Sequence, residues 1–238
     1  MNKCYYVNFN QIGYGSMQLL QRALVQARQK QKIPDVVLLL EHEPVVTVGK
    51  AGGLENMLLS SRELEDKGIS LYNSERGGNI TYHGPGQLVV YPIMDLKTYQ
   101  IDLTWYVRQL EMTIINTLGE YGITSSTAAK RTGVWLGNKK IAAIGIGIKK
   151  WVTYHGIALN INNDLKPFSY IVPCGLADFG VTSISDQLGI EVSLIEVRKK
   201  FIRNFIQTFQ VEACELTPDK LLELCSSEMA ELEQELLL

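Results

Sequence analysis

The sequence VWLGNKKIAAIGIGI, residues 134–148, carries the pattern on which the fold depends. Two extended apolar runs flank the dipeptide Gly137-Asn138, which is typical of a tight turn between antiparallel strands. The pattern predicts a β-hairpin formed by residues 134–136 and 140–148. Hairpin-linked strands favour a mixed sheet over a doubly wound parallel sheet.

Helical and extended patterns alternate around this hairpin. Apolar residues spaced three and four apart predict helices, and short β-branched runs next to Pro or Gly predict strands. The expected helices are 14–32, 60–67, 104–121, 193–208 and 218–237, and the expected strands are 35–40, 45–48, 88–93 and 151–161. The sequence therefore predicts an α+β fold with a mixed β-sheet flanked by helices.

No change in composition marks a domain boundary along the 238 residues. We therefore expect a single catalytic domain over residues 1–238, with a core at about 5–210 and a C-terminal helical extension at about 217–238.

Composition excludes several classes of protein. The chain is 46% hydrophobic with a net charge of −2, so it can bury a core and has no strong attraction for nucleic acid or an anionic membrane. The first residues lack a signal-peptide pattern, and no apolar stretch approaches the roughly 18 residues of a membrane span. Four cysteines do not indicate a disulfide-stapled fold. We expect a reduced, cytoplasmic protein without nucleic-acid or membrane partners.

The segment RGGNITYHGPGQ, residues 76–87, contains four glycines between strands. Glycines let a ligand approach the backbone closely, and they also serve tight connections that need positive φ angles. Arg76, Tyr82 and His83 in the same segment favour a binding loop.

The segment Ile171-Val172-Pro173-Cys174-Gly175 contains a candidate nucleophile. The proline fixes the backbone before Cys174, and the glycine after it leaves room for an incoming carbonyl. A thiol of pKa about 8.5 is only a few per cent ionised at neutral pH, so a nucleophilic cysteine needs a nearby cation. The alternative is a small buried apolar residue in a turn. For Cys4, Cys214 and Cys225 we expect structural roles.

Lys140 stands at the start of the apolar strand of the hairpin, where a lysine side chain can be partly desolvated. Lys139 points to the opposite face of an extended strand, so one of the two lysines faces the core side. The alternative is that both are solvated turn lysines. His83 and His155 recur in Thr-Tyr-His-Gly segments, and a buried structural histidine is the simpler interpretation of each.

Other common sites are missing from the sequence. Gly13 and Gly15 lack the third glycine of a dinucleotide loop, and no Walker-type lysine loop occurs. Histidines and cysteines do not have the spacing of metal ligands. We therefore expect neither a metal nor a cofactor.

Four motifs together resemble the lipoyl (octanoyl) transferases, the LipB family. They are RGG and TYHGPGQ within residues 76–87, KIAAIG at 140–145, HGIALN at 155–160 and PCG at 173–175. LEHEPVVTVG at 40–49 resembles the N-terminal strand motif of the family, except that Glu43 stands where members often have proline. The resemblance covers about residues 5–210 and leaves out the helix beyond Thr217.

The resemblance implies an acyltransferase that moves an octanoyl group from acyl carrier protein to a lysine of a lipoyl-domain protein, the first step of protein lipoylation. The implied acceptors are 2-oxoacid dehydrogenase E2 subunits or the glycine cleavage H protein, and the implied fold is that of biotin and lipoate protein ligases. The acyl-thioester cysteine of the family corresponds to Cys174, and the lysine that lowers its pKa corresponds to Lys140. The implied substrate contacts are Arg76, Gly77, Gly78, Asn79, Ile80, Thr81, Tyr82, His83, Ala143, Ile144, Gly145, Gly156, Ile157 and Ala158.

Chemistry agrees with this implication. A thioester donor is already activated, so amide formation needs no ATP. Backbone amides of Gly175 or of the Gly77-Gly78 loop are candidates for holding the oxyanion, and the apolar side chains of the two strands suit an eight-carbon chain. The lysine and arginine pairs at 130–131, 139–140 and 149–150 are candidates for contacting an acidic carrier protein.

Two other functions stay open from the sequence. An ATP-dependent lipoate-protein ligase would share the fold without needing Cys174. A non-catalytic module that binds an acyl group or a lipoyl domain would keep the pocket but form no covalent intermediate.

Overall fold

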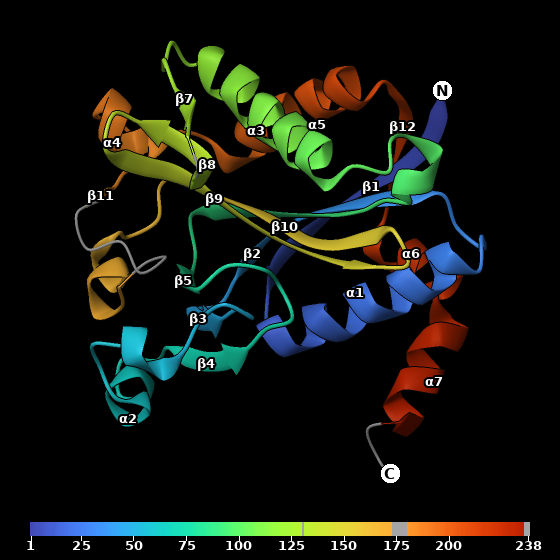
Figure 1. The fold of residues 1–238 in the computed structure, drawn as a ribbon, viewed down its shortest axis with the longest axis horizontal. Coiled ribbons are helices and arrows are strands. Elements are labelled where there is room, and N and C mark those ends of the chain that lie inside the picture. The colour runs from blue at the N-terminus through green and yellow to red at the C-terminus, as the bar shows by residue number, and fades with distance from the viewer. Residues whose placement is uncertain (130, 173–179, 236–238) are drawn as a thin grey trace.

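A computed structural model describes residues 1–129, 131–172 and 180–235 of the chain. A mixed sheet runs through the centre of the molecule in the order β12-β1-β2-β6-β10-β9-β8-β7 (Figure 1). Its strands are β1 (Asn2–Ile12), β2 (Asp35–His42), β6 (Gln87–Ile93), β7 (Ser126–Ala128), β8 (Arg131–Leu136), β9 (Lys139–Lys149), β10 (Val152–Asn160) and β12 (Val211–Leu216), and β11 (Gly180–Val181) pairs with the start of β9.

The sheet combines parallel and antiparallel pairs. β1 is parallel to β12 and β2, whereas β2–β6, β6–β10, β10–β9, β9–β8 and β8–β7 are antiparallel. The expected hairpin is β8–β9, with Gly137 at φ +58° in its turn. The predicted α+β class and mixed sheet are therefore confirmed.

Helices cover both faces of the sheet. α3 (Leu103–Gly119) and α5 (Leu194–Phe209) pack on one face, and α1 (Tyr14–Gln29) packs on the other (Figure 1). β2 shows why: Val37 and Leu39 join the cluster under α3 and α5, while Val36 and Leu38 join the cluster under α1. Successive side chains of a strand point to opposite faces, so a central strand covered on both sides is an unbroken apolar run.

A smaller sheet, β4-β3-β5, lies beside the main one. It consists of β3 (Val45–Val48), β4 (Ser70–Asn73) and β5 (Ile80–His83), and shares an apolar cluster with residues near α2 (Ser61–Glu65), η1 (Leu54–Asn56) and η3 (Lys166–Tyr170). β5 lies inside the glycine-rich segment that the sequence predicts as a loop. Its pairing partner is the distant β3, with Val48 opposite Ile80, so the local pattern does not reveal it.

Caps begin several helices where the sequence predicts. Ser60 and Glu63 form a capping box at α2, and the side chains of Asp102 and Ser193 cap α3 and α5. The short helices α4 (Ile184–Leu188) and η2 (Leu96–Thr98) complete the described elements before β12.

The prediction of one C-terminal helix over 218–237 is wrong. The chain forms α6 (Pro218–Leu224) and α7 (Ser226–Glu235), and Cys225 between them has φ −117°, outside the helical range. The bend brings Leu221, Cys225 and Leu232 into the apolar cluster under α1.

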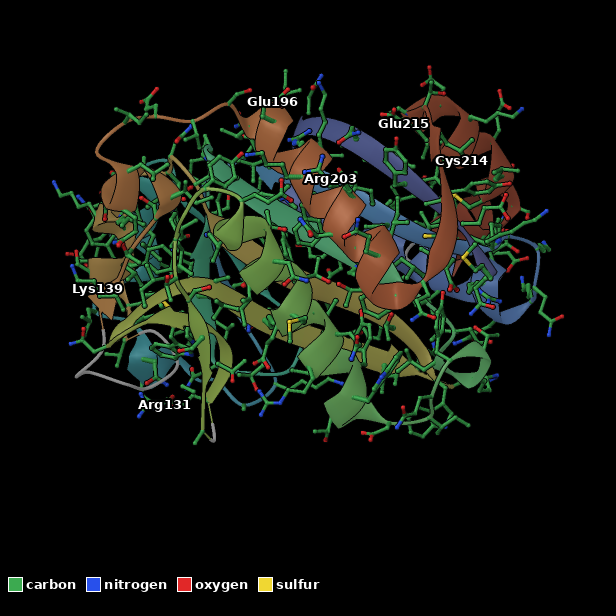
Figure 2. All side chains as sticks on the ribbon, turned by 90° about the horizontal axis from the view of Figure 1, so that it is seen from above. Arg131, Lys139, Glu196, Arg203, Cys214 and Glu215 are labelled. Atoms are coloured by element: carbon green, nitrogen blue, oxygen red, sulfur yellow. The ribbon has the colours of Figure 1, made fainter. Side chains whose placement is uncertain are left out.

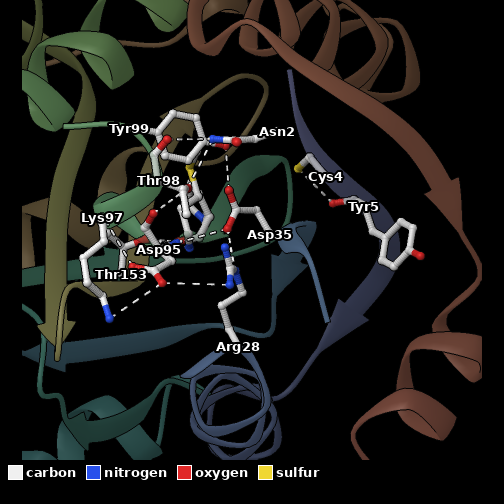
Figure 3. A network of polar contacts seen from close by, with 12 residues as sticks. Asn2, Cys4, Tyr5, Arg28, Asp35, Asp95, Lys97, Thr98, Tyr99 and Thr153 are labelled. Atoms are coloured by element: carbon white, nitrogen blue, oxygen red, sulfur yellow. Dashed lines mark hydrogen bonds and ion pairs between the residues drawn. The ribbon is translucent and has the colours of Figure 1, made fainter. Parts of the chain in front are cut away.

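A buried polar network joins α1 to the strands near the N-terminus (Figure 3). Asp35 is 1% exposed and accepts hydrogen bonds from Arg28 Nε at 2.8 Å, from the Tyr99 hydroxyl at 2.6 Å and from the Asp95 amide at 3.1 Å. Because these bonds come from α1 and from the turn after β6, this carboxylate ties both to β2.

No helix within the described ranges is long and apolar enough to cross a membrane.

Candidate active site

A cavity of about 690 Å³ opens where the glycine-rich loop meets β9 and β10. Its walls come from residues 76–81 and 83, from β8–β10, from the first turns of α3 and from Tyr14 at the start of α1. The volume lies within the range of about 300–1,000 Å³ usual for small-molecule sites.

The cavity gathers most of the residues singled out from the sequence. Its lining contains Lys140 and every expected substrate contact except Tyr82: Arg76, Gly77, Gly78, Asn79, Ile80, Thr81, His83, Ala143, Ile144, Gly145, Gly156, Ile157 and Ala158. Segments that are separate in sequence thus form one concave surface.

Tyr82 does not line the cavity. Its ring packs edge-on against Phe168 at 5.7 Å, and burial raises its pKa to about 12. The other three residues of β5, Ile80, Thr81 and His83, do line the cavity.

Arg76 holds the glycine-rich loop in place. This side chain is 7% exposed, and its Nη2 donates to the Thr47 carbonyl at 2.6 Å and to the Thr47 hydroxyl at 2.8 Å. Gly49 and Gly145 lie against the same loop, and a Cβ on either would lie within 2.4 Å and 2.9 Å of the Gly78 and Gly77 carbonyl oxygens, respectively. These glycines let the loop lie directly on the strands.

The packing of the backbone restricts two of the expected substrate contacts, Gly77 and Gly156. The Gly77 amide donates to the Ile146 carbonyl at 2.8 Å, so it serves the loop and is not available for an oxyanion. A Cβ on Gly156 would lie 2.3 Å from the Val90 carbonyl oxygen of β6. A larger residue there would therefore push neighbouring strands apart before it narrowed the cavity.

All three histidines of the chain lie in one buried cluster around Tyr14. The Tyr14 ring lies 5.3 Å from the His42 ring and 6.5 Å from the rings of His83 and His155. His42 donates from Nδ1 to the Ile12 carbonyl at 2.8 Å, so its Nε2 accepts from the Tyr91 hydroxyl at 2.8 Å. The sequence did not indicate this convergence, because the three residues are far apart in the chain.

The histidine cluster is neutral. Burial, which penalises the charged ring, lowers the pKa of His42 to about 4 and is the largest cause of lowering the pKa of His83 and of His155 to about 3. The Arg76 charge adds to the lowering at His83 and His155. The part of the cavity wall formed by Tyr14, His83 and His155 is thus aromatic and uncharged at neutral pH.

Lys140 enters the cavity from the start of β9. It is partly buried, whereas Lys139 is exposed, as the alternation of the strand predicts.

Figure 2 shows Arg131 and Lys139 at one end of the molecule, with Cys214 and Glu215 at the opposite end.

Cys174, Pro173 and Gly175 lie outside the described residues, as does Lys130. The chain on both sides of segment 173–179 is described. Before it, the Val172 amide donates to the Asn56 carbonyl at 2.8 Å, and Asn56 Nδ2 donates to Asn79 Oδ1 of the glycine-rich loop at 3.2 Å. After it, Val181 pairs with Lys140. Both flanks are therefore bonded to elements that line the cavity.

The cavity also includes residues that the sequence reasoning missed. They are Tyr14, Ala51, Tyr91, Leu103, Val107, Thr132 and Ile146. Two residues with other sequence-based roles also line it: Arg131, a candidate contact for an acidic carrier protein, and His155, for which the sequence favours a structural role. Among the described residues, no group of three His, Cys, Asp or Glu side chains could hold a metal ion.

The chain matches known proteins over most of its length. The family model of the lipoyl protein ligase A/B catalytic domain matches residues 14–206. An octanoyltransferase of Clostridium kluyveri is 45% identical over 225 residues, which cover 94% of this chain and 96% of that relative. An octanoyltransferase of Solibacter usitatus is 48% identical over 212 residues, which cover 89% of this chain and 96% of that relative.

A solved structure shows the same fold at lower identity. It is a candidate lipoate protein ligase from T. acidophilum with bound lipoic acid, with a TM-score of 0.78 and 21% identity, covering 98% of this chain and 95% of that one. The fold expected from the resemblance is thus confirmed. With the family model and the two relatives, the chain belongs to the lipoyl protein ligase A/B catalytic-domain family and is an enzyme that transfers acyl groups.

Proposed function

We propose that this enzyme moves an octanoyl group from acyl carrier protein to a lysine of a lipoyl-domain protein through a thioester on Cys174. The observation that carries the proposal is that Lys140 lines the cavity next to β11, while Val172 on the other flank of segment 173–179 is bonded to Asn56. Cys174 follows Val172 by two residues. This arrangement supports a reaction between the two side chains.

The resting pair is a Cys174 thiolate and a Lys140 ammonium. In the first step the thiolate attacks the octanoyl thioester carbonyl, the new carbon–sulfur bond forms and the bond to the phosphopantetheine sulfur breaks. That leaving thiolate takes the proton of the Lys140 ammonium. An exchange of one thioester for another is nearly balanced in free energy, so the step needs no ATP.

In the second step the acceptor lysine attacks as a neutral amine. A carbon–nitrogen bond forms, the bond to Cys174 breaks, and the neutral Lys140 takes the proton from the amine nitrogen. The thiolate and ammonium pair is thereby restored. With the Gly77 amide already bonded, the amide of Gly78 or Gly175 is the proposed oxyanion donor.

The walls of the cavity suit an apolar chain. Ile144 and Ile157 lie beside the small residues Ala143 and Ala158 on adjacent strands, with Ala143 opposite Ala158 and Ile144 opposite Ile157. Each methylene buried there would contribute about 0.8 kcal/mol to binding. We propose that these residues, Gly145 and Gly156 and the loop at Arg76–His83 form the octanoyl site, with Tyr82 supporting the loop from behind.

The proposed donor is octanoyl-acyl carrier protein, and the proposed acceptors are the E2 subunits of 2-oxoacid dehydrogenases or the glycine cleavage H protein. The reaction needs no metal or cofactor. A cytoplasmic location fits it, because the intermediate requires a reduced cysteine. Arg131 and Lys140 at the cavity, with the exposed Lys139, are the proposed contacts for an acidic carrier protein.

An ATP-dependent ligase is the second candidate, because a solved neighbour of the same fold is a candidate lipoate protein ligase. That neighbour is 21% identical to the chain, whereas the octanoyltransferase relatives are 45% and 48% identical. The balance of similarity therefore favours transfer.

The test incubates the protein with octanoyl-acyl carrier protein in the absence of ATP and maps adducts by mass spectrometry. We expect one octanoyl adduct on Cys174, loss of that adduct in Cys174→Ala, and an unchanged adduct in Cys214→Ala. Cys214 is the matched control, because it is exposed on β12 at the far end of the molecule. A strict need for ATP and free acid would favour the ligase, and binding without an adduct would favour a non-catalytic module.

A further inference from the structure

The ammonium of Lys140 rests on an aromatic ring. Its Nζ lies 4.6 Å from the centroid of the Trp135 ring, and Trp135 is only 2% exposed. The two residues are directly opposite each other in the β8–β9 register. A cation within about 6 Å of an indole centroid is attracted by the ring quadrupole, and the attraction strengthens where water is excluded.

The glycine at position 133 leaves space on β8 for the aliphatic part of the Lys140 side chain. A Cβ on Gly133 would lie 3.6 Å from Lys140 Cε and 2.6 Å from the Ala142 carbonyl oxygen. Gly133 has φ +120°, which L side chains rarely adopt, and the register shifts between Val134 and Trp135. The bulge and the glycine together let the stem of Lys140 lie close to β8.

A buried carboxylate fixes that bulge. Glu111 of α3 is 1% exposed, its Oε1 accepts from the Gly133 amide at 3.0 Å, and its Oε2 pairs with Arg108. On the other side of β9, the Thr182 amide donates to the Lys140 carbonyl at 3.0 Å. Hydrogen bonds therefore fix the backbone of β8 on one side of Lys140 and of the segment after β11 on the other.

A second cation shares the ring. The Arg131 guanidinium lies 5.6 Å from the Trp135 centroid. Within the described part of the chain, the charged groups near this part of β9 include Arg131 from β8 and the Arg108–Glu111 pair from α3.

We propose that Trp135 is a positioning residue that holds the Lys140 ammonium toward the cavity and stabilises its charged form. The inference rests on the proposed function, in which a Lys140 ammonium and a Cys174 thiolate form the resting pair. Transfer of the thiol proton to the amine creates an ammonium and a thiolate, and only the ammonium gains from the ring. Trp135 therefore favours the reactive pair without touching the substrate, and it is absent from the lining of the cavity.

Fluorescence tests the contact without relying on activity. The chain has three tryptophans, so the variant Trp105→Phe/Trp151→Phe leaves Trp135 as the sole emitter. In that background we expect Lys140→Met to change the intensity and wavelength of emission, Lys140→Arg to restore most of the original spectrum, and Lys139→Met to leave it unchanged. Lys139 is the matched control because it is the exposed neighbour on the same strand. Equal spectra for all variants would overturn the contact.

Alkylation kinetics test the positioning. The rate of iodoacetamide reaction at Cys174 is followed against pH in wild type, Trp135→Phe and Trp135→Leu, with Trp105→Phe as the control. We expect Trp135→Leu to lower the rate at neutral pH by about tenfold and Trp135→Phe by less, because phenylalanine retains a weaker cation–π contact. A profile unchanged by both substitutions would overturn the role of Trp135. Lys140→Met in the same assay reports separately on the proposed function.

Discussion

His42, His83 and His155 share one property that governs how the molecule responds to acid. In the folded chain each ring is buried and neutral, with a pKa of about 4, 3 and 3, respectively, against an ordinary value of 6.5. A lowered pKa means that the unfolded chain binds protons at a higher pH than the folded chain does. The contribution of the three neutral histidines to the free energy of unfolding is therefore complete above pH 6.5. It is lost as the pH falls toward their pKa values in the folded chain.

Acidification from pH 7 to pH 5 should lower the free energy of unfolding by about 2 kcal/mol for each histidine. Urea denaturation at the two pH values measures the difference. The variant His42→Gln removes one titrating ring and should reduce the difference by about a third. An equal pH dependence in wild type and variant would show that His42 is accessible to protons in the folded state.

At the scale of elements, a buried carboxylate of α7 pairs with two lysines at the C-terminal end of α1. Glu228 is fully buried and pairs with Lys32 at 2.6 Å and Lys30 at 3.2 Å. Burial would raise the pKa of this carboxyl, but hydrogen bonds from Lys32, Ser227 and Lys30 outweigh it and lower the pKa to about 2. The stabilisation that the ionised Glu228 gives to the packing of α7 on α1 is therefore complete above about pH 4.5, and it weakens as the pH falls toward 2.

Replacing Glu228 with Gln should cost about 1–2 kcal/mol of stability at pH 7, because hydrogen bonds to a charged group are lost. Glu231→Gln is the matched control, since this residue also pairs with Lys30 but is exposed, and we expect a change below about 0.5 kcal/mol. Thermal unfolding at pH 7 compares the two variants. Equal effects would place the attachment of α7 in its apolar contacts alone.

Comparison of the expected with the observed helices and strands shows which elements a sequence pattern can predict. The β8–β9 hairpin follows from Gly137-Asn138 and its apolar flanks, and α3 and α5 follow from a periodic apolar face, because these signals are local. The break at Cys225 depends on how Leu221 and Leu232 reach the cluster under α1, which is a tertiary effect. The sequence pattern does not reveal β4, β7, β11 and β12, since short or edge strands depend on their partners more than on their own pattern. It also does not reveal β1, an eleven-residue strand that lies between β12 and β2.

For the site, motifs located Lys140 and the loop at Arg76, but the sequence could not show what these residues contact. The contact of Lys140 with Trp135 depends on the bulge at Gly133. The uncharged part of the cavity wall depends on the burial of three histidines that come from separate strands. Likewise, the bond of the Gly77 amide to Ile146 emerges only when the loop lies on β9.

At the scale of the whole molecule, we propose that the chain is one catalytic domain in which the terminal helices support the core. Leu221, Cys225 and Leu232 of the α6–α7 region are buried in the cluster that α1 shares with the main sheet. α1 in turn begins at Tyr14, which lines the cavity.

A variant that ends at Thr217 should therefore lose about 3–5 kcal/mol of stability, because a fully buried leucine contributes about 1.5–3 kcal/mol. Chemical denaturation measures the loss, with a variant that ends at Glu235 as the control. If the variant that ends at Thr217 were as stable as the control, the last two helices would be an independent appendage.

The position of Cys214 has a practical consequence. This thiol is exposed at the end of the molecule opposite Arg131 and Lys139, whereas Cys4 and Cys225 are buried. Maleimide coupling through Cys214 would immobilise the enzyme on a sensor chip with its cavity turned toward the flowing solution. Under the proposed mechanism, an octanoyl group on Cys174 would block that thiol, so the acylated enzyme would consume one maleimide fewer per molecule than the free enzyme.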